Sequence, residues 1–344
     1  MPCFNDAYWS ATQLEALQKI IACEHLSVVS KQSGGNSVVY GVSADDKLYA
    51  VKLYPPYTPG GRDRLASELA VYQFFLQQQV SMVPQLRAYC EQKRWLIIDW
   101  IDGIHLETYT PGHIQQALDF IQLTANLSQT QAAAVLPQAA EPCLSLQGLI
   151  AQIQQRLKRL LNQSDDKSLH IFLLNEFKTA FSELHKRAIQ GYKTLGLPVD
   201  CALSEDNWAL IPADFGFHNI LCTSAGQFYF FDFDYFGWDD PVKLLSDILW
   251  HPKMTLTDGQ KKQFIAGFST IFSSDALFSQ RFDYHFPLFG LRWVLILLNE
   301  FIAEFWQNRQ HARVYDDRAV AKTAQLQRAH ALLEAVQQQT GCFA

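Results

Sequence analysis

Residues 211–247 have the sequence IPADFGFHNILCTSAGQFYFFDFDYFGWDDPVKLLSD. In this stretch Asp214 is followed five residues later by Asn219, and a hydrophobic run then carries Asp232 and Asp234. Because successive side chains of a β-strand point to opposite faces, we expect the two later carboxylates on one face of a strand. Carboxylates on an otherwise aromatic strand are costly to bury without a cation or a hydrogen-bond partner. A hard divalent metal such as Mg²⁺, which takes oxygen ligands, would supply that cation.

The loop PADFGFHN, residues 212–219, is rich in residues that interrupt regular structure. One interpretation is an ordinary Asx-turn, followed by a strand whose Asp side chains face water. The other is a catalytic loop, because D-x-x-x-x-N occurs in the kinase fold, where the Asp accepts the proton of the attacking hydroxyl and the Asn binds metal. Together, D-x4-N, the hydrophobic strand with F-D-F-D and the D-P helix start resemble the aminoglycoside phosphotransferase and choline kinase family.

The resemblance implies an α+β, two-lobed protein-kinase-like fold. Residues 1–102 would form an N-terminal nucleotide-binding lobe around a small antiparallel sheet. Residues 103–344 would form a larger, mostly helical C-terminal lobe for catalysis and acceptor binding. The local patterns agree, because residues 26–54 are expected to form three strands joined by turns, and helical patterns prevail from Thr110 onward.

Lys52 lies in the motif A-V-K on the third of these strands, and it matches the lysine that pairs with the nucleotide phosphates in the kinase fold. The alternative is a strand lysine that reaches solvent. Glu68 borders the buried side of a helix expected over residues 62–79, so its carboxylate needs a partner. We expect an ion pair with Lys52, as in the kinase fold; a surface pair with Arg64 is the alternative.

The remaining nucleotide contacts are implied by the resemblance. The glycines of the turn SGGNS would let backbone N–H groups approach phosphates, although an ordinary hairpin turn has the same composition. The implied set is Gly34 and Gly35 at the phosphates, Ala50 above adenine, the hinge backbone of Asp99, Trp100 and Ile101, and Leu221 below adenine.

The resemblance also assigns roles to the acidic residues. Asp214 would orient and deprotonate the acceptor hydroxyl. Asn219 and Asp232 would bind Mg²⁺, with Asp234 as an auxiliary ligand, and the nucleotide would be ATP. Asp247, on the core side of the helix that begins at Asp240-Pro241, would brace the catalytic loop.

The acceptor pocket carries no motif. Arg292 and Asn299 are seven residues apart in an apolar stretch, so on a helix they would share a face. They form either a satisfied structural pair or part of a substrate pocket. A small-molecule hydroxyl of aminoglycoside, choline or sugar type is the expected acceptor class.

Two positions depart from the family pattern. Pro212 stands where the family has the His of H-G-D, and Gly216 stands where it often has a basic residue that helps to neutralise the phosphoryl group. His218 could partly substitute if it turns inward. These departures suggest a bacterial branch with its own substrates and leave open a catalytically inactive pseudokinase that binds nucleotide and a partner. A protein kinase is disfavoured, because the sequence has no A-P-E segment.

Composition excludes several other classes. The chain has 344 residues, a net charge of −6 and no basic run, which disfavours nucleic acid and anionic membranes as partners. Seven scattered cysteines without C-x-x-C argue against a disulfide framework and fit the cytoplasm. The apolar stretch from Pro287 is interrupted by polar residues, so we expect a buried helix there. The N-terminus lacks the basic and apolar regions of a signal peptide.

Overall fold

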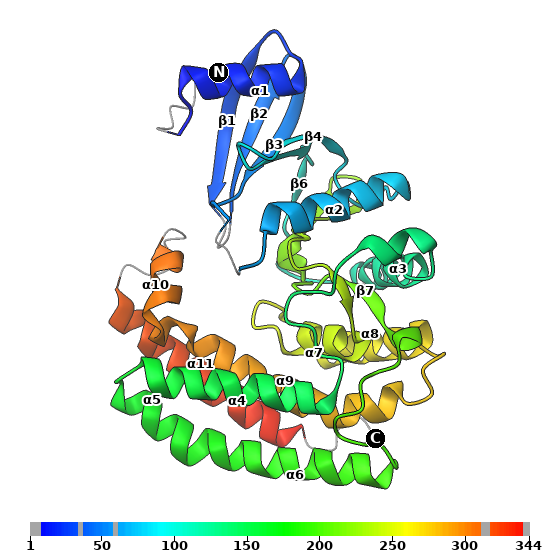
Figure 1. The fold of residues 1–344 in the computed structure, drawn as a ribbon, viewed down its shortest axis with the longest axis vertical. Coiled ribbons are helices and arrows are strands. Elements are labelled where there is room, and N and C mark those ends of the chain that lie inside the picture. Colours follow the sequence, from blue (N-terminus) through cyan, green and yellow to red (C-terminus); the bar gives the residue numbers. More distant parts are fainter. Residues whose placement is uncertain (1–7, 34–36, 58–60, 311–316, 340–344) are drawn as a thin grey trace. The chain divides into compact units, whose positions relative to one another are not determined.

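The computed structural model describes residues 8–33, 37–57, 61–310 and 317–339. The chain forms two compact units (Figure 1). Unit 1 comprises residues 1–107, 130–137 and 217–236, and unit 2 comprises residues 108–129, 138–216 and 237–344. The segment that carries Asn219, Asp232 and Asp234 therefore packs with the N-terminal sheet, although it lies far along the chain.

Unit 1 contains a five-stranded antiparallel sheet of order β1-β2-β3-β5-β4. Its strands are β1 (Leu26–Ser33), β2 (Val38–Ala44), β3 (Lys47–Leu53), β4 (Leu86–Cys90) and β5 (Trp95–Asp99). The first three are the strands expected from the sequence. Helix α1 (Ala11–Ile21) begins at a capping box of Ser10 and Gln13, and its buried Leu17 packs with Val42 and Trp95 of the sheet. Helix α2 (Arg64–Gln77) contributes Glu68.

A second sheet in unit 1 positions the acidic segment. It has the order β6-β8-β9, with strands β6 (Gly103–Ile104), β8 (Ile220–Thr223) and β9 (Phe228–Phe230). A 3-10 turn, Phe217–Asn219, precedes β8. The expectation that Asp232 and Asp234 share one strand face is wrong, because the strand ends at Phe230. Asp232 has a φ of 68°, in the left-handed region, which turns the chain and ends the alternation of faces.

Unit 2 is mostly helical, with a two-stranded sheet of β7 (Ala209–Ile211) and β10 (Gly237–Asp239). Helix α9 lies at its centre and packs against α4, α6, α7 and α11. The helices are α3 (Pro111–Leu127), α4 (Leu146–Gln163), α5 (Lys167–Ile171), α6 (Lys178–Thr194), α7 (Pro241–Trp250), α8 (Asp258–Ile271), α9 (Phe278–Leu297), α10 (Ala303–Gln310) and α11 (Arg318–Gln338). A π-helical segment, Phe172–Phe177, joins α5 to α6, and a 3-10 segment, Leu298–Phe301, follows α9.

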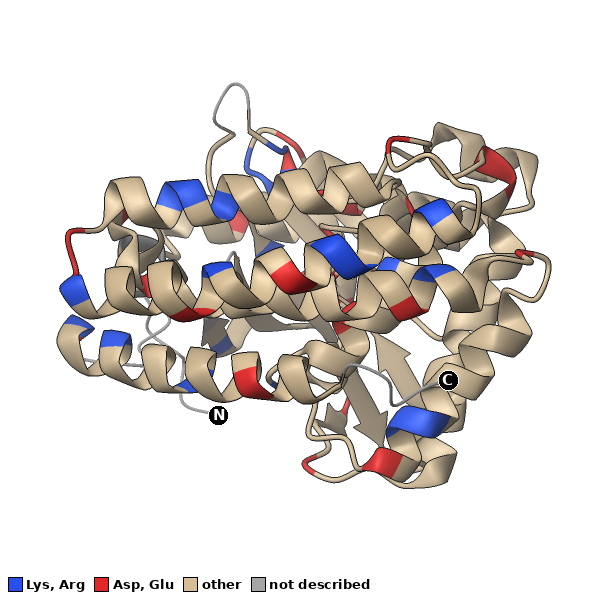
Figure 2. Ribbon diagram, turned by 90° about the horizontal axis from the view of Figure 1, so that it is seen from below, with Lys and Arg blue, Asp and Glu red and all other residues tan. Residues whose placement is uncertain are grey.

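Charged residues of both signs are interspersed along the helices shown in Figure 2. The cysteines of the described ranges, Cys23, Cys90, Cys143, Cys201 and Cys222, are free thiols. Within the same ranges, the structure contains no helix with the length and apolar character needed to span a bilayer.

The close packing around α9 can be tested at Gly290. A Cβ at this position would lie 2.5 Å from a Val336 methyl and 2.9 Å from the Trp250 ring. Overpacking of this kind costs about 1–3 kcal/mol, against at most about 1 kcal/mol gained in helix propensity. We therefore expect Gly290→Ala to lower the free energy of unfolding measured with urea. Gly259→Ala in α8, where the nearest atom would be 4.0 Å away, is the matched control and should leave it unchanged or raise it.

Candidate active site

The predicted ion pair between Lys52 and Glu68 is present. Lys52 Nζ lies 2.6 Å from Glu68 Oε2 and also 2.6 Å from Asp232 Oδ1. The Lys52 and Glu68 side chains are only 8% and 1% exposed. Burial alone would lower the pKa of Lys52, but the carboxylates of Glu68 and Asp232 raise it overall, so the lysine stays charged. The alternative partner, Arg64, pairs with Asp234 instead.

Glu68 connects three parts of unit 1. Its Oε2 accepts hydrogen bonds from Lys52 and from the hydroxyl of the buried Tyr54, and its Oε1 accepts one from the Phe233 N–H at 3.2 Å. Through these contacts, Glu68 of α2 is linked to Lys52 in β3, to Tyr54 directly after β3 and to the turn after Asp232. Burial raises the pKa of Glu68, and the charge of Lys52 opposes that shift.

Asp234 is buried in a crowded acidic environment. Its Oδ2 accepts a hydrogen bond from Arg64, and its carbonyl accepts one from Arg62 Nε at 2.7 Å. Burial, with the charges of Asp232 and Glu68, raises the pKa of Asp234 to about 7 despite the contact with Arg64. Its Oδ1 is buried without a hydrogen-bond partner among the described residues. This carboxylate therefore has an unsatisfied acceptor that a cation would satisfy.

Asn219 and Asp232 come close in unit 1 through their backbones, because the Asn219 carbonyl accepts the Phe231 N–H at 3.2 Å. The Asp232 side chain is 36% exposed, and Lys52 contacts one of its oxygens. Asn219, Asp232 and Asp234 together offer an amide oxygen, a partly exposed carboxylate and the buried Asp234 Oδ1. This set fits Mg²⁺, which prefers oxygen ligands and usually binds one or two carboxylates.

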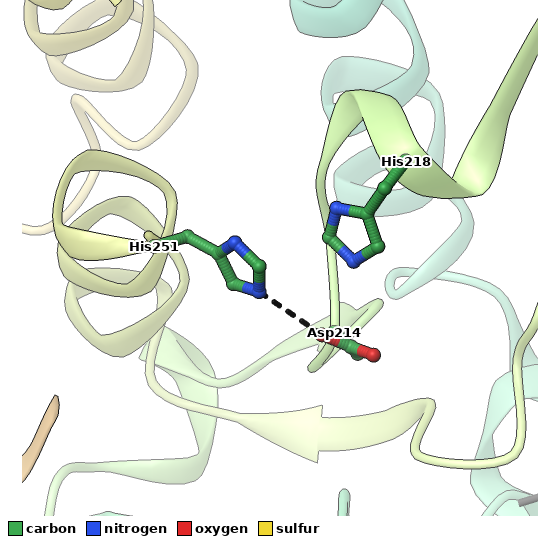
Figure 3. A group of neighbouring side chains, drawn as sticks. All are labelled: Asp214, His218 and His251. Atoms are coloured by element: carbon green, nitrogen blue, oxygen red, sulfur yellow. Dashed lines mark ion pairs between the residues drawn. The ribbon is translucent and has the colours of Figure 1, made fainter. Parts of the chain in front are cut away.

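Asp214 belongs to unit 2 and follows β7 in the loop after Pro212. The next residue, Phe215, is buried and stacks on Phe120 of α3, which anchors the loop. The Asp214 side chain is 38% exposed, and its Oδ1 lies 3.6 Å from Nε2 of His251 at the end of α7 (Figure 3). The Asp214 carboxylate is thus partly exposed, while the residue next to it is buried and anchors the loop.

The predicted adenine-contacting residues lie in unit 1. Cross-strand pairing sets Ser30, Gly41, Ala50 and Ile98 in one row, so their side chains share a face of the sheet. A Cβ at Gly41 would lie 2.9 Å from the Trp100 ring, which therefore packs on that face. Only a glycine at this position leaves room for the indole.

The hinge backbone is partly engaged within unit 1. The Asp99 N–H donates to the Gln85 carbonyl at 3.0 Å, and the Trp100 N–H donates to the Leu48 carbonyl at 3.4 Å. The Asp99 carboxylate pairs with Arg87. If the hinge binds adenine, it must do so through Ile101 or through carbonyl oxygens.

Of four other predicted residues, two lie in the described part of unit 1 and two fall outside the described ranges. Leu221 lies in β8, opposite Tyr229. His218 lies in the 3-10 turn before that strand. Gly34 and Gly35 lie outside the described residues.

Arg292 is part of a buried ion network in unit 2. It pairs with Asp247 at 3.1 Å and with Glu141 at 3.1 Å. Asp247 also contacts Lys243 at 3.5 Å and accepts the Trp293 indole N–H at 2.8 Å. These contacts support a structural role for Arg292, but with Asp247 and Glu141 as its partners and not Asn299. The contacts of Asp247 with Arg292 and Trp293 connect α7 to α9. The role of Asp247 in bracing the catalytic loop stays a prediction.

Asn299 does not share a helix face with Arg292, so that expectation is wrong. Helix α9 ends at Leu297, and Asn299 lies in the following 3-10 segment, where the spacing of seven residues no longer brings side chains to one face. The half-buried Asn299 accepts a backbone hydrogen bond from Ile302 through its carbonyl.

Sequence reasoning missed several residues that contact the predicted site residues, among them Tyr54, Arg62, Arg64 as the partner of Asp234, and His251. Tyr54 carried a usable signal, because it lies two residues after Lys52 at the end of the same strand. His251 carried none, since it meets Asp214 only through tertiary structure.

The sequence model of the phosphotransferase enzyme family matches residues 29–278. The chain belongs to this family. The fold agrees with solved phosphotransferases, although sequence identity to them is low. A spectinomycin phosphotransferase solved with ADP and spectinomycin superposes with a TM-score of 0.62 at 13% identity, covering 97% of this chain and 100% of that one.

Two further solved structures show the same likeness. A putative aminoglycoside phosphotransferase from Ralstonia eutropha has a TM-score of 0.59 at 13% identity, covering 96% of this chain and 98% of that one. The choline kinase LicA from Streptococcus pneumoniae has a TM-score of 0.55 at 13% identity, covering 94% of this chain and 100% of that one. The comparison with curated proteins finds no match. The α+β, two-lobed kinase-like fold expected from the sequence is therefore confirmed.

The hydrogen bond between Tyr54 and Glu68 should contribute measurably to the stability of unit 1. Tyr54→Phe would remove a buried donor to a charged group, a loss of about 1.5–3 kcal/mol. We expect a lower midpoint of urea denaturation, with little change for Tyr89→Phe, whose side chain is largely exposed on β4. Equal midpoints for both variants would contradict a stabilising role for this hydroxyl.

The raised pKa of Asp234 predicts a pH-dependent stability. Between the usual pKa of 3.8 and about 7, the folded protein keeps a proton that the unfolded chain has released, so stability falls as pH rises through this range. Asp234→Asn removes that penalty. Without metal or nucleotide, the variant should melt above wild type at about pH 8.5, and the difference should be smaller at about pH 5.

Asp46→Asn, at an exposed turn, is the control for Asp234→Asn and should show no such pH dependence. A variant that melts below wild type at the higher pH would mean that the ion pair with Arg64 outweighs burial.

Proposed function

We propose that the protein is an ATP-dependent kinase that transfers the γ-phosphoryl group to a hydroxyl of a small molecule. The observation that carries the proposal is Lys52, buried and held between Glu68 and Asp232. A lysine that stays charged in a buried position, next to a carboxylate with an exposed oxygen, suits a site for nucleotide phosphates and their metal. Family membership supports the transfer of a phosphoryl group.

Each of the proposed site residues would have a distinct role. Lys52, oriented by Glu68, would bind the nucleotide phosphates. Asn219 and Asp232 would hold Mg²⁺, with the buried Asp234 as an auxiliary ligand. When bound, the metal would neutralise charge on the phosphates. Asp214 would orient the acceptor hydroxyl and take its proton, so that catalysis comes mainly from positioning and electrostatics.

The acceptor is proposed only as a class. The similar structures include proteins described as acting on spectinomycin and on choline, which are a sugar-like antibiotic and a cationic alcohol. We propose an alcohol of aminoglycoside, choline or sugar type. Arg292 does not extend this proposal, because Asp247 and Glu141 engage its guanidinium.

The alternative of an inactive nucleotide-binding pseudokinase rests on Pro212 and Gly216. The chain keeps a partly exposed carboxylate at Asp214, which a scaffold that only binds nucleotide would not need. We therefore favour the enzyme.

The nucleotide site can be tested by thermal unfolding with ATP or GTP, each with and without Mg²⁺. A ligand that binds only the folded protein stabilises it by about 2.7 kcal/mol at 100 times its Kd. We expect a Mg²⁺-dependent rise of the melting temperature in wild type that is lost in Asp232→Ala. The absence of any shift with either nucleotide would remove the basis for a kinase.

The catalytic base has a separate test. Asp214→Ala should keep the Mg²⁺-dependent thermal shift but abolish phosphoryl transfer in an acceptor screen that follows ADP formation. The removal of a positioned base typically costs about 10²–10⁴ in rate. Unchanged turnover in this variant would exclude Asp214 as the base.

A further inference from the structure

His251 has one defined tautomer in unit 2. It follows α7 as its C-terminal cap residue, and its side chain is 9% exposed. Nδ1 accepts the backbone N–H of Lys253 at 3.1 Å. In a neutral imidazole the other nitrogen must then carry the proton, so Nε2–H is the donor. Nε2 is the atom that faces Asp214 Oδ1, at 3.6 Å.

The imidazole ring is held in this orientation by its packing on the half-buried Trp293. It packs edge to face on Trp293 of α9, with ring centroids 4.8 Å apart. The Trp293 indole N–H donates to Asp247, which is paired in turn with Arg292. The direction of Nε2–H is therefore set by the packing of α7 against α9 and by the hydrogen bond from Lys253.

We propose that His251 is a positioning residue for the catalytic base. The Nε2–H would engage one oxygen of Asp214 and so fix the direction in which the other oxygen meets the acceptor hydroxyl. The 3.6 Å separation is slightly longer than a hydrogen bond. Contacts of this kind often tighten once substrates bind. The inference rests on the proposed function, because it concerns the base of that reaction.

In the transfer step, a lone pair of the acceptor oxygen forms the new O–P bond, and the bond from phosphorus to the leaving oxygen breaks with its electron pair going to ADP. The acceptor proton goes to Asp214. His251 keeps its own proton throughout and exchanges nothing with the substrate. It acts only through the orientation of the carboxylate.

The departures from the family pattern at Pro212 and Gly216 explain why a donor from His251 would be needed. Neither residue offers a side-chain donor, and the proline lacks a backbone N–H as well. A loop with these residues has fewer local groups to orient its Asp. His251 supplies a donor from outside the loop.

Two amide substitutions separate orientation from packing. The side-chain nitrogen of His251→Gln is as many bonds from the backbone as Nε2, so it can still donate to Asp214. His251→Asn has the same chemistry but is one methylene shorter. ADP formation from Mg-ATP would be measured with water as the acceptor and in the acceptor screen, together with the KM for ATP and the melting temperature.

We expect His251→Asn to lower kcat by about 10- to 100-fold with the KM for ATP unchanged, since misplacement of a reacting group costs up to about 10². His251→Gln should stay within about threefold of wild type, as a donor at the Nε2 position is retained. His330→Leu, which removes a partly exposed histidine on α11, is the control and should match wild type.

The outcomes separate the two proposals. Wild-type kcat in His251→Asn, or equal losses in the Asn and Gln variants at equal melting temperatures, would overturn the positioning role while leaving the kinase intact. Absence of ADP formation by wild type with water and with every acceptor would overturn the proposed function, and the role of His251 with it.

Discussion

The buried carboxylate of Glu68 is the constraint on which unit 1 depends. A charge at a position that is 1% exposed is tolerated only if it is paired and hydrogen-bonded. Lys52, the Tyr54 hydroxyl and the Phe233 N–H meet that need together. The same contacts that make Glu68 tolerable also set the position of Lys52 and of the turn after Asp232. In this unit the stability of the fold and the geometry of the proposed phosphate site therefore rest on one network.

One carboxylate beside that network, Asp234, lies in an unfavourable environment. Burial, together with the charges of Asp232 and Glu68, raises the pKa of Asp234 despite its contact with Arg64. One Asp234 oxygen is buried without a partner among the described residues, and the Asp232 carboxylate is partly exposed. Such an arrangement is costly for the protein by itself and favourable for a bound cation. Proteins accept this kind of local instability where it serves binding, which is why we propose the metal site here.

The sequence predicted best where a local rule decides the outcome. The three strands around Lys52 and the helix start at Asp240 depend on neighbouring residues, and all are present. The prediction for Asp232 and Asp234 failed because the strand ends at Phe230 and Asp232 is left-handed, and the alternation of apolar residues does not record φ. The pairing of Asn299 with Arg292 failed because α9 ends at Leu297, with neither glycine nor proline to mark the end. The proximity of His251 to Asp214 could not be predicted from the sequence, since it arises only when α7 and α9 have packed.

The same reasoning explains how the loop of residues 212–219 could differ from the family at motif positions and still orient Asp214, the proposed base. Orientation of a carboxylate requires a donor at the right point in space, not at a fixed place in the sequence. In unit 2, Asp247 binds Arg292 and the Trp293 indole, and Trp293 supports the ring of His251. The ion network between α7 and α9 thus fixes a donor next to Asp214 from outside the loop. A loop supported in this way would depend less on its own residues, which is how the proposed function accommodates Pro212 and Gly216.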